Sequence, residues 1–165
     1  MKKRVLVAYS TKYGSTTEVA QKISEVLNES GFASEVKNVK EVSDVGSYDA
    51  IIVGSAIYVG KVLPESLNFV TKHKTSLSKV PMAYFVVSGR YGDNPTKNFT
   101  EADGSMNPFR ELVKPIDTTV TGGKIDYAAL NFFERIMCRL LGAKESDHRN
   151  WTEIEKWAKG LSGKI

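Results

Sequence analysis

The chain has 165 residues, 41% of them hydrophobic and 25% charged, and this ordinary globular balance excludes a disordered or fibrous protein. Its single cysteine and two separated histidines exclude an internal disulfide and a cysteine-ligated metal cluster, so we expect no metal site. The formal net charge is +4 and the isoelectric point is about 9.1, but the basic residues are dispersed, so we expect no nucleic-acid partner.

The N-terminal segment does not have the pattern of a leader peptide. Met1–Arg4 runs directly into the apolar run Val5–Tyr9, which is typical of a buried strand. No apolar stretch reaches the roughly 18 residues that a membrane-spanning helix needs. We therefore expect a cytoplasmic protein.

Strands and helices alternate along the chain. Short apolar runs predict strands, and apolar residues at helical spacing predict helices. The expected strands cover about 3–9, 32–38, 50–53, 82–87 and 118–121, and the expected helices about 15–30, 64–77, 106–113 and from Asn150 onward. The alternation predicts a single α/β domain over residues 1–165, with a doubly wound parallel sheet.

The turn Ser10–Thr16, between the first strand and the first helix, is rich in hydroxyl groups. Free N–H groups at a helix N-terminus, together with the helix dipole, attract a phosphate. The turn has neither the P-loop pattern nor the Gly-x-Gly-x-x-Gly pattern, so a single phosphate monoester fits it best. An alternative interpretation is that Ser15 and Glu18 only form a capping box. That alternative leaves Ser10, Thr11 and Thr16 unexplained, so we favour phosphate binding.

Three loops are expected to meet at the carboxyl edge of the sheet, where ligands of such sheets bind. They are Ser10–Thr16, Gly54–Gly60 and Ser88–Asn94, and each contains one tyrosine: Tyr13, Tyr58 and Tyr91. Three aromatic side chains at one edge favour a flat cofactor.

A phosphoacceptor receiver domain shares this architecture but requires carboxylates at the same edge. The first strand here ends in Tyr9-Ser10, and the third is followed by Gly54-Ser55. Asp49 is expected at the opposite end of the third strand. Metal-assisted phosphoryl transfer is therefore excluded.

The turn Ser10-Thr-Lys-Tyr-Gly-Ser-Thr16 and the loop Gly54-Ser-Ala-Ile-Tyr-Val-Gly60 resemble those of flavodoxin-type FMN-binding domains. Within this family, the second loop is similar to the Gly-Ser/Ala-Ser/Ala-Ile-x-x-Gly pattern of the branch that contains the menaquinone-dependent protoporphyrinogen oxidases. The resemblance spans nearly the whole chain. It implies a flavodoxin-like sheet of five strands in the order 2-1-3-4-5, with helices on both faces and FMN as the cofactor.

The resemblance also implies which residues bind the cofactor. In the first loop they are Ser10, Thr11, Lys12, Tyr13, Gly14, Ser15 and Thr16, which would surround the FMN phosphate. In the other two loops they are Ser55, Ala56, Ile57, Tyr58, Val59 and Gly60, and Ser88, Gly89, Arg90, Tyr91, Gly92, Asp93 and Asn94, which would contact the isoalloxazine. Since the flavin carries the chemistry, no catalytic acid, base or nucleophile is expected.

An insertion at about 124–149 separates the fifth strand from the last helix, and its segment Tyr127–Leu141 predicts a helix. Apolar residues cover most of its circumference, more than the single stripe of a surface helix. One interpretation is that the helix is buried, with Cys138 as a small core residue. The other is that it lies beside the flavin and exposes apolar surface to a substrate, a quinone, a membrane or a second subunit, with Arg135 and Arg139 able to meet an anionic group.

Two functions remain open at this point. One is an FMN-dependent oxidoreductase that acts on a porphyrinogen-like substrate of heme biosynthesis and passes electrons to a quinone, as the resemblance implies. The other is an electron-transfer shuttle of the ordinary flavodoxin kind, with no substrate of its own. Shuttles generally are acidic proteins that dock on basic partners, so the basic charge of this chain favours the oxidoreductase.

Overall fold

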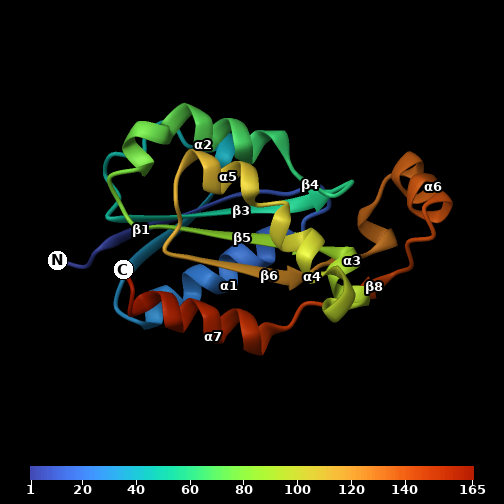
Figure 1. Ribbon diagram of the computed structural model, residues 1–165. Helices are drawn as coiled ribbons and strands as arrows, with labels where there is room; N and C mark the ends of the chain where they lie inside the picture. Colours follow the sequence, from blue (N-terminus) through green and yellow to red (C-terminus); the bar gives the residue numbers. More distant parts are fainter.

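Five parallel strands form the centre of the molecule, and helices cover both faces of the sheet (Figure 1). The structure is a computed structural model that describes residues 1–165. The strands are β1 (Arg4–Ser10), β2 (Ala33–Asn38), β3 (Ala50–Tyr58), β5 (Met82–Ser88) and β6 (Asp117–Gly122), in the order β2-β1-β3-β5-β6. The expected α/β fold and strand order are confirmed.

Alternate side chains of each strand enter two separate cores, because successive residues of a strand point to opposite faces. Leu6, Ile51 and Tyr84 belong to one core, and Val7, Ile52 and Phe85 belong to the other. The three central strands are buried on both faces, which is why they are continuous apolar runs.

Each core is closed by its own helices. On one face lie α2 (Pro64–Leu77) and α5 (Asn107–Leu112), and on the other lie α1 (Ser15–Glu29) and α7 (Trp151–Ser162) (Figure 1). Helix α7 contributes Ile154, Ala158 and Leu161 to the core, as their helical spacing predicts. Helix α1 packs beside α7, so the C-terminal helix lies next to the first helix of the chain.

The edge that carries the predicted loops is more regular than expected. Strand β3 continues to Tyr58 and turns back through β4 (Lys61–Val62), which pairs with it antiparallel. Residues 89–93 form a short helix, α3 (Gly89–Asp93), followed by α4 (Pro95–Gly104); neither was predicted. Ser88 and Asn94 cap these two helices by accepting hydrogen bonds from the amides of Tyr91 and Lys97. A short 3-10 turn, η1 (Val39–Glu41), follows β2.

The prediction of one continuous helix over Tyr127–Leu141 is wrong. The insertion consists of β7 (Lys124–Ile125), a 3-10 turn η2 (Tyr127–Ala129), helix α6 (Phe132–Leu140) and β8 (Ser146–Asp147), which pairs with β7. The break has a local cause, since Asn131 caps α6 in a capping box with Glu134. None of the helices has the length and apolar character needed to cross a bilayer.

Gly54 is required because β3 passes directly under a buried ring. A Cβ atom at this position would lie 2.0 Å from Cζ of Phe85, which is itself fully buried. We expect Gly54→Ala to lower the free energy of unfolding by about 1–3 kcal/mol, because the Phe85 ring must be displaced. Chemical denaturation of the apoprotein measures this loss.

Gly160→Ala is the matched control. Gly160 lies in the interior of α7 with nothing within 4 Å of its added Cβ, so the substitution should raise the stability by up to about 1 kcal/mol. Equal stability of the two variants would contradict the packing argument.

Candidate functional site

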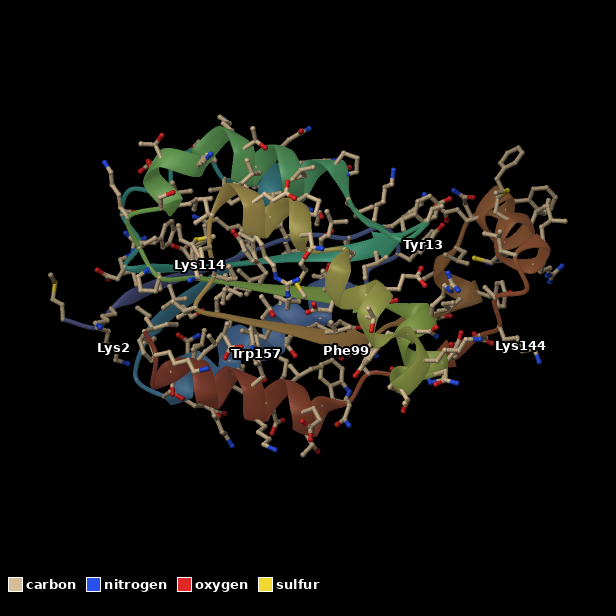
Figure 2. All side chains as sticks on the ribbon, viewed as in Figure 1. Lys2, Tyr13, Phe99, Lys114, Lys144 and Trp157 are labelled. Atoms are coloured by element: carbon tan, nitrogen blue, oxygen red, sulfur yellow. The ribbon has the colours of Figure 1, made fainter.

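The register of the sheet brings the three predicted segments to one edge. Ser10 at the end of β1 lies opposite Ser55 of β3, and Ala56 lies opposite Val87 of β5. The neighbouring strands β1 and β3 leave the sheet toward helices on opposite faces, which is the position where ligands of doubly wound sheets bind. Figure 2 shows Tyr13 at this edge, beside the end of β3.

Helix α1 begins at this edge without a side-chain cap. Its N-cap is Gly14, which has a φ of 94°, a left-handed conformation that glycine adopts readily. The capping-box alternative is therefore wrong: Ser15 is the first helical residue, and the carboxylate of Glu18 pairs with Arg149 instead. Thr11 shapes the turn, because its Oγ1 accepts a hydrogen bond of 2.9 Å from the amide of Gly14. The positive end of α1 is left available to an anion.

Thr16, in the first turn of α1, has a buried hydroxyl group with no partner. The residue is fully buried, and its Oγ1 forms no hydrogen bond. An unpaired buried polar group costs about 1–3 kcal/mol, so such groups are rare unless a ligand pairs with them. The orphaned hydroxyl thus lies where the sequence predicts a phosphate.

Ser10 and Ser55 differ from Thr16, because their hydroxyl groups are used within the protein. Ser10 Oγ lies 2.5 Å from Oγ of Ser66 in α2 and 3.4 Å from Oγ of Ser55. Ser55 Oγ accepts from the amide of Leu63 at 2.8 Å, and Ser66 Oγ donates to the carbonyl of Gly54 at 2.9 Å. These bonds fasten β1, β3 and α2 together directly beneath the site. Sequence reasoning missed Ser66, since nothing local distinguishes it.

Two of the three tyrosines lie close together. The Lys12 ammonium is 3.2 Å from the ring centre of Tyr58 and 5.8 Å from that of Tyr13, a cation–π arrangement that joins the first two segments. Tyr91 packs instead against Phe99 of α4, with 6.3 Å between ring centres. Burial raises the pKa of Tyr13, and the neighbouring Cys138, Tyr58 and Glu134 add to this effect. Figure 1 shows α6 beyond this same end of the sheet.

The third segment is held by polar contacts that the sequence did not reveal. Arg90 forms an ion pair with Glu101 of α4 at 3.0 Å, and Asp93 lies 3.0 Å from Nε2 of His148. Gly92 leaves room for this histidine, since an added Cβ would lie 2.3 Å from Cβ of His148. The segment 88–94 is thus fixed to α4 on one side and to the end of the insertion on the other.

The hairpin tip between β3 and β4 has strained backbone. Val59 has a φ of 50° and Gly60 a φ of 72°, the signs that a two-residue hairpin turn requires. A β-branched residue seldom adopts this conformation, and strain of this kind gathers at functional sites. Val59 is also 80% exposed, so the strained tip lies at the surface of the candidate site.

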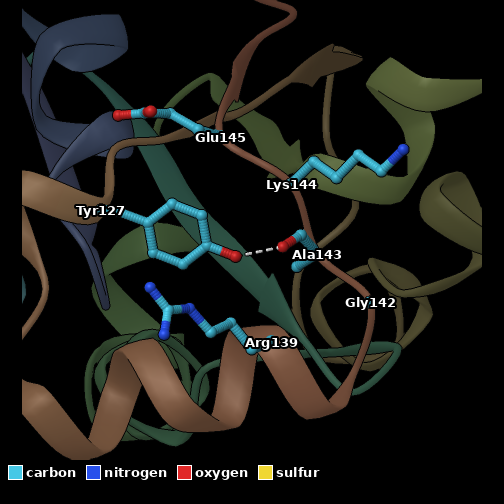
Figure 3. A pocket seen from close by; sticks show the side chains of 6 residues that line it. All are labelled: Tyr127, Arg139, Gly142, Ala143, Lys144 and Glu145. Atoms are coloured by element: carbon cyan, nitrogen blue, oxygen red, sulfur yellow. Dashed lines mark hydrogen bonds between the residues drawn. The ribbon is translucent and has the colours of Figure 1, made fainter.

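The insertion presents both an apolar surface and a cavity. Six apolar side chains of α6 and its C-terminal end are exposed: Phe132, Phe133, Ile136, Met137, Leu140 and Leu141. Only the opposite face of α6 is covered, where Cys138 is buried. Beside this helix, a cavity of about 380 Å³ is lined by Tyr127, Arg139, Gly142, Ala143, Lys144 and Glu145 (Figure 3). Tyr127 donates a hydrogen bond across it to the carbonyl of Ala143 (Figure 3).

The sequence matches the family model described as a flavodoxin domain over residues 6–151. The chain belongs to the flavodoxin domain family. A curated relative, protoporphyrinogen IX dehydrogenase (quinone) of Escherichia coli strain K12, is 24% identical over 172 positions, which cover 96% of this chain and 94% of the relative.

Solved flavodoxin structures share the fold. A flavodoxin of Streptococcus pneumoniae TIGR4 has a TM-score of 0.66 at 16% identity, covering 98% of this chain and 99% of that chain. A Fusobacterium nucleatum flavodoxin bound to flavin mononucleotide has a TM-score of 0.62 at 13% identity, covering 99% of each chain. FMN is the cofactor of the flavodoxin domain family, to which this chain belongs. The uncapped α1 and the unpaired Thr16 hydroxyl fit the phosphate of such a cofactor.

Removing the hydroxyl group of Thr16 and that of Ser66 should have different effects on the stability of the apoprotein. Thr16→Val keeps the shape of the side chain and removes an unpaired hydroxyl, so we expect the stability to be unchanged or raised by about 1 kcal/mol. Ser66→Ala removes a hydroxyl with two partners and should lower the stability by about 1–3 kcal/mol. Urea denaturation of FMN-free protein compares them, and a large loss in Thr16→Val would show that its hydroxyl already has a partner.

Proposed function

We propose that this protein is an FMN-dependent oxidoreductase that oxidises a porphyrinogen-like substrate and passes the electrons to a quinone. The observation that carries the proposal is the exposed apolar face of α6, which lies beyond the edge of the sheet where we place the cofactor (Figure 1). A bulky apolar substrate and a quinone both need apolar surface near the flavin. The named activity of the Escherichia coli relative supports the same substrate and acceptor.

In this proposal, the first segment holds the phosphate. The amides of the first turn of α1 and the hydroxyl of Thr16 donate to it, while Thr11 fixes the turn through Gly14. Lys12, Tyr13, Ser15 and the buried Ser10 complete this segment.

The other two segments hold the ring in this proposal. Residues 55–60, with Tyr58 and the hairpin tip, and residues 88–94 would contact the isoalloxazine. The bound flavin supplies one-electron and two-electron transfer, so the protein needs only to orient it, shield it from water and admit the substrate.

The cavity beside α6 suits the polar end of such a substrate. Its lining carries two cations, Arg139 and Lys144, and one carboxylate, Glu145. Arg139 has no ion-pair partner in the structure, and Figure 3 shows its guanidinium group beside the Tyr127 ring. Porphyrinogens combine an apolar macrocycle with carboxylate side chains. An apolar helix face with a free arginine next to it matches both features.

The second candidate function is that of an electron-transfer shuttle, which the fold itself favours. The structural neighbours include flavodoxins that cover nearly the whole chain. A shuttle gives no role to six exposed apolar side chains on one helix, however, and complementary charge argues against a basic protein docking on a basic reductase.

Placing a negative charge in the phosphate site should abolish FMN binding. We expect Thr16→Glu and Thr11→Glu to weaken FMN binding by at least about a hundredfold, because the carboxylate repels the phosphate at short range. Fluorescence titration of the apoprotein with FMN measures the affinity. Thr71→Glu, at an exposed position of α2, is the control and should bind FMN normally. Undiminished binding by Thr16→Glu would refute the phosphate assignment.

The proposed activity is tested by electron transfer with defined partners. Purified holoprotein should reduce a quinone with protoporphyrinogen as the donor. If neither protoporphyrinogen nor a reduced nicotinamide supports turnover, while electrons exchange rapidly with ferredoxin-type proteins, the shuttle is the correct function. Because FMN content is measured in the same sample, failure of the activity is distinguished from loss of the cofactor.

The apolar face of α6 should be needed for that activity but not for FMN. We expect Phe133→Ser with Met137→Ser to lower turnover at least about tenfold while FMN affinity stays within about twofold. Both side chains are exposed, so little core packing is lost. Ile116→Ser, at another exposed apolar position, is the control and should keep full activity.

The same double variant tests two other roles of α6. Normal turnover with lost binding to anionic lipid vesicles would assign the face to a peripheral membrane contact. Normal turnover with a loss of dimers in solution would assign it to a subunit interface. Either result would remove the substrate role from α6.

A further inference from the structure

Arg149, at the end of the insertion, connects two carboxylates from distant parts of the chain. Its side chain is only 6% exposed. Nε lies 2.9 Å from Oδ1 of Asp147, and Nη2 lies 2.7 Å from Oδ2, so this pair is bidentate. Nη1 donates to Glu18 of α1, and the guanidinium group lies 4.7 Å from the ring centre of Trp151. A charged group buried to this extent is held in one position.

The negative charge of Glu18 disfavours the binding of a phosphate at the N-terminus of α1. It is the fourth residue of α1, and helical side chains lean toward the N-terminus of their helix. Its carboxylate therefore lies in the first turn of α1, on the exposed side of the helix, whereas the unpaired hydroxyl of Thr16 is buried in the same turn. In the apoprotein, an acidic group there suits the helix dipole. A phosphate monoester carries close to two negative charges at neutral pH, and an unneutralised carboxylate in the same turn would repel it.

We propose that Arg149 is a positioning residue for FMN, which neutralises Glu18 and holds its carboxylate away from the phosphate. Asp147 fixes two of the guanidinium nitrogens, so the third donor group stays directed at Glu18. The pKa of Asp147 is lowered to about 2 by its hydrogen bonds to Arg149, so this anchor stays charged at neutral pH. The position of the end of the insertion is thereby linked to the affinity for the cofactor.

The test compares FMN with riboflavin, which has the same ring and no phosphate. Arg149→Met removes the charge and keeps most of the aliphatic stem. We expect its FMN affinity to fall about tenfold, or about 1.4 kcal/mol, while its riboflavin affinity stays within about twofold. Fluorescence titration of apoprotein measures both. An equal loss for the two ligands, or no loss for FMN, would overturn the proposal, because a purely structural role of Arg149 cannot distinguish them.

Charge rescue provides a second criterion. Adding Glu18→Gln to Arg149→Met should restore most of the FMN affinity, since the repelling carboxylate is gone. Added salt should also reduce the defect of Arg149→Met, because screening weakens the repulsion. A double variant as weak as the single one would contradict neutralisation of Glu18.

Glu18→Gln alone keeps the proposal testable if Arg149→Met does not fold. The substitution removes one negative charge from the first turn of α1 while Arg149 stays paired with Asp147, so the ratio of FMN to riboflavin affinity should rise about two- to threefold. A fall in this ratio would count against the proposal. Lys164→Met, which removes a cation that pairs with Asp117, is the matched control and should leave the ratio unchanged.

Discussion

The in-register pairing of β1 with β3 determines where every other part of the site can lie. Ser10 and Ser55 are partners in this ladder, so the turn into α1 leaves the sheet beside Ser55, and β3 continues three residues beyond it to the hairpin with β4. The hydroxyl groups of Ser10, Ser55 and Ser66 then fasten the two strands to α2 just below that edge. A slip of one residue would direct the core side chains to the wrong faces and break this cluster.

The start of α1 has two features that lower the stability of the apoprotein and suit an anionic ligand. A side-chain cap often satisfies one of the first amides of a helix, but Gly14 supplies none. Thr16 adds a buried hydroxyl without a partner. Both features are unfavourable in the absence of an anion, and both become favourable when a phosphate accepts from them. A cofactor that binds only the folded state returns this stability to the holoprotein.

The insertion makes few backbone and core contacts, but several polar side-chain contacts hold it in place. Its antiparallel pair β7–β8 has only two residues in each strand, and α6 buries little besides Cys138. Polar ties compensate: Arg135 Nε donates to the carbonyls of Tyr127 and Leu130, and Arg149 links the end of the insertion to α1. The apolar side of α6 is thus held in place while it remains uncovered, an arrangement suited to contact with an apolar partner.

The amino-acid sequence by itself determined the five strands and their parallel arrangement, and it predicted the edge where we propose that the cofactor binds. These follow from apolar runs and helical stripes, which are local patterns, and from the rule that ligands bind at the carboxyl ends of parallel strands. The hydroxyl-rich turn also indicated a phosphate, which agrees with FMN as the cofactor of the flavodoxin domain family.

Only the tertiary structure decided which of those hydroxyl groups is free. Ser10 and Thr16 look alike in the sequence, but Ser66, which lies 56 residues beyond Ser10, pairs with it, and no group reaches Thr16. The role of Glu18 changed for the same reason, since its partner Arg149 lies 131 residues away and replaces a local capping box. Local patterns determine which groups a turn offers, whereas contacts between distant residues determine which of them remain unpaired for a ligand.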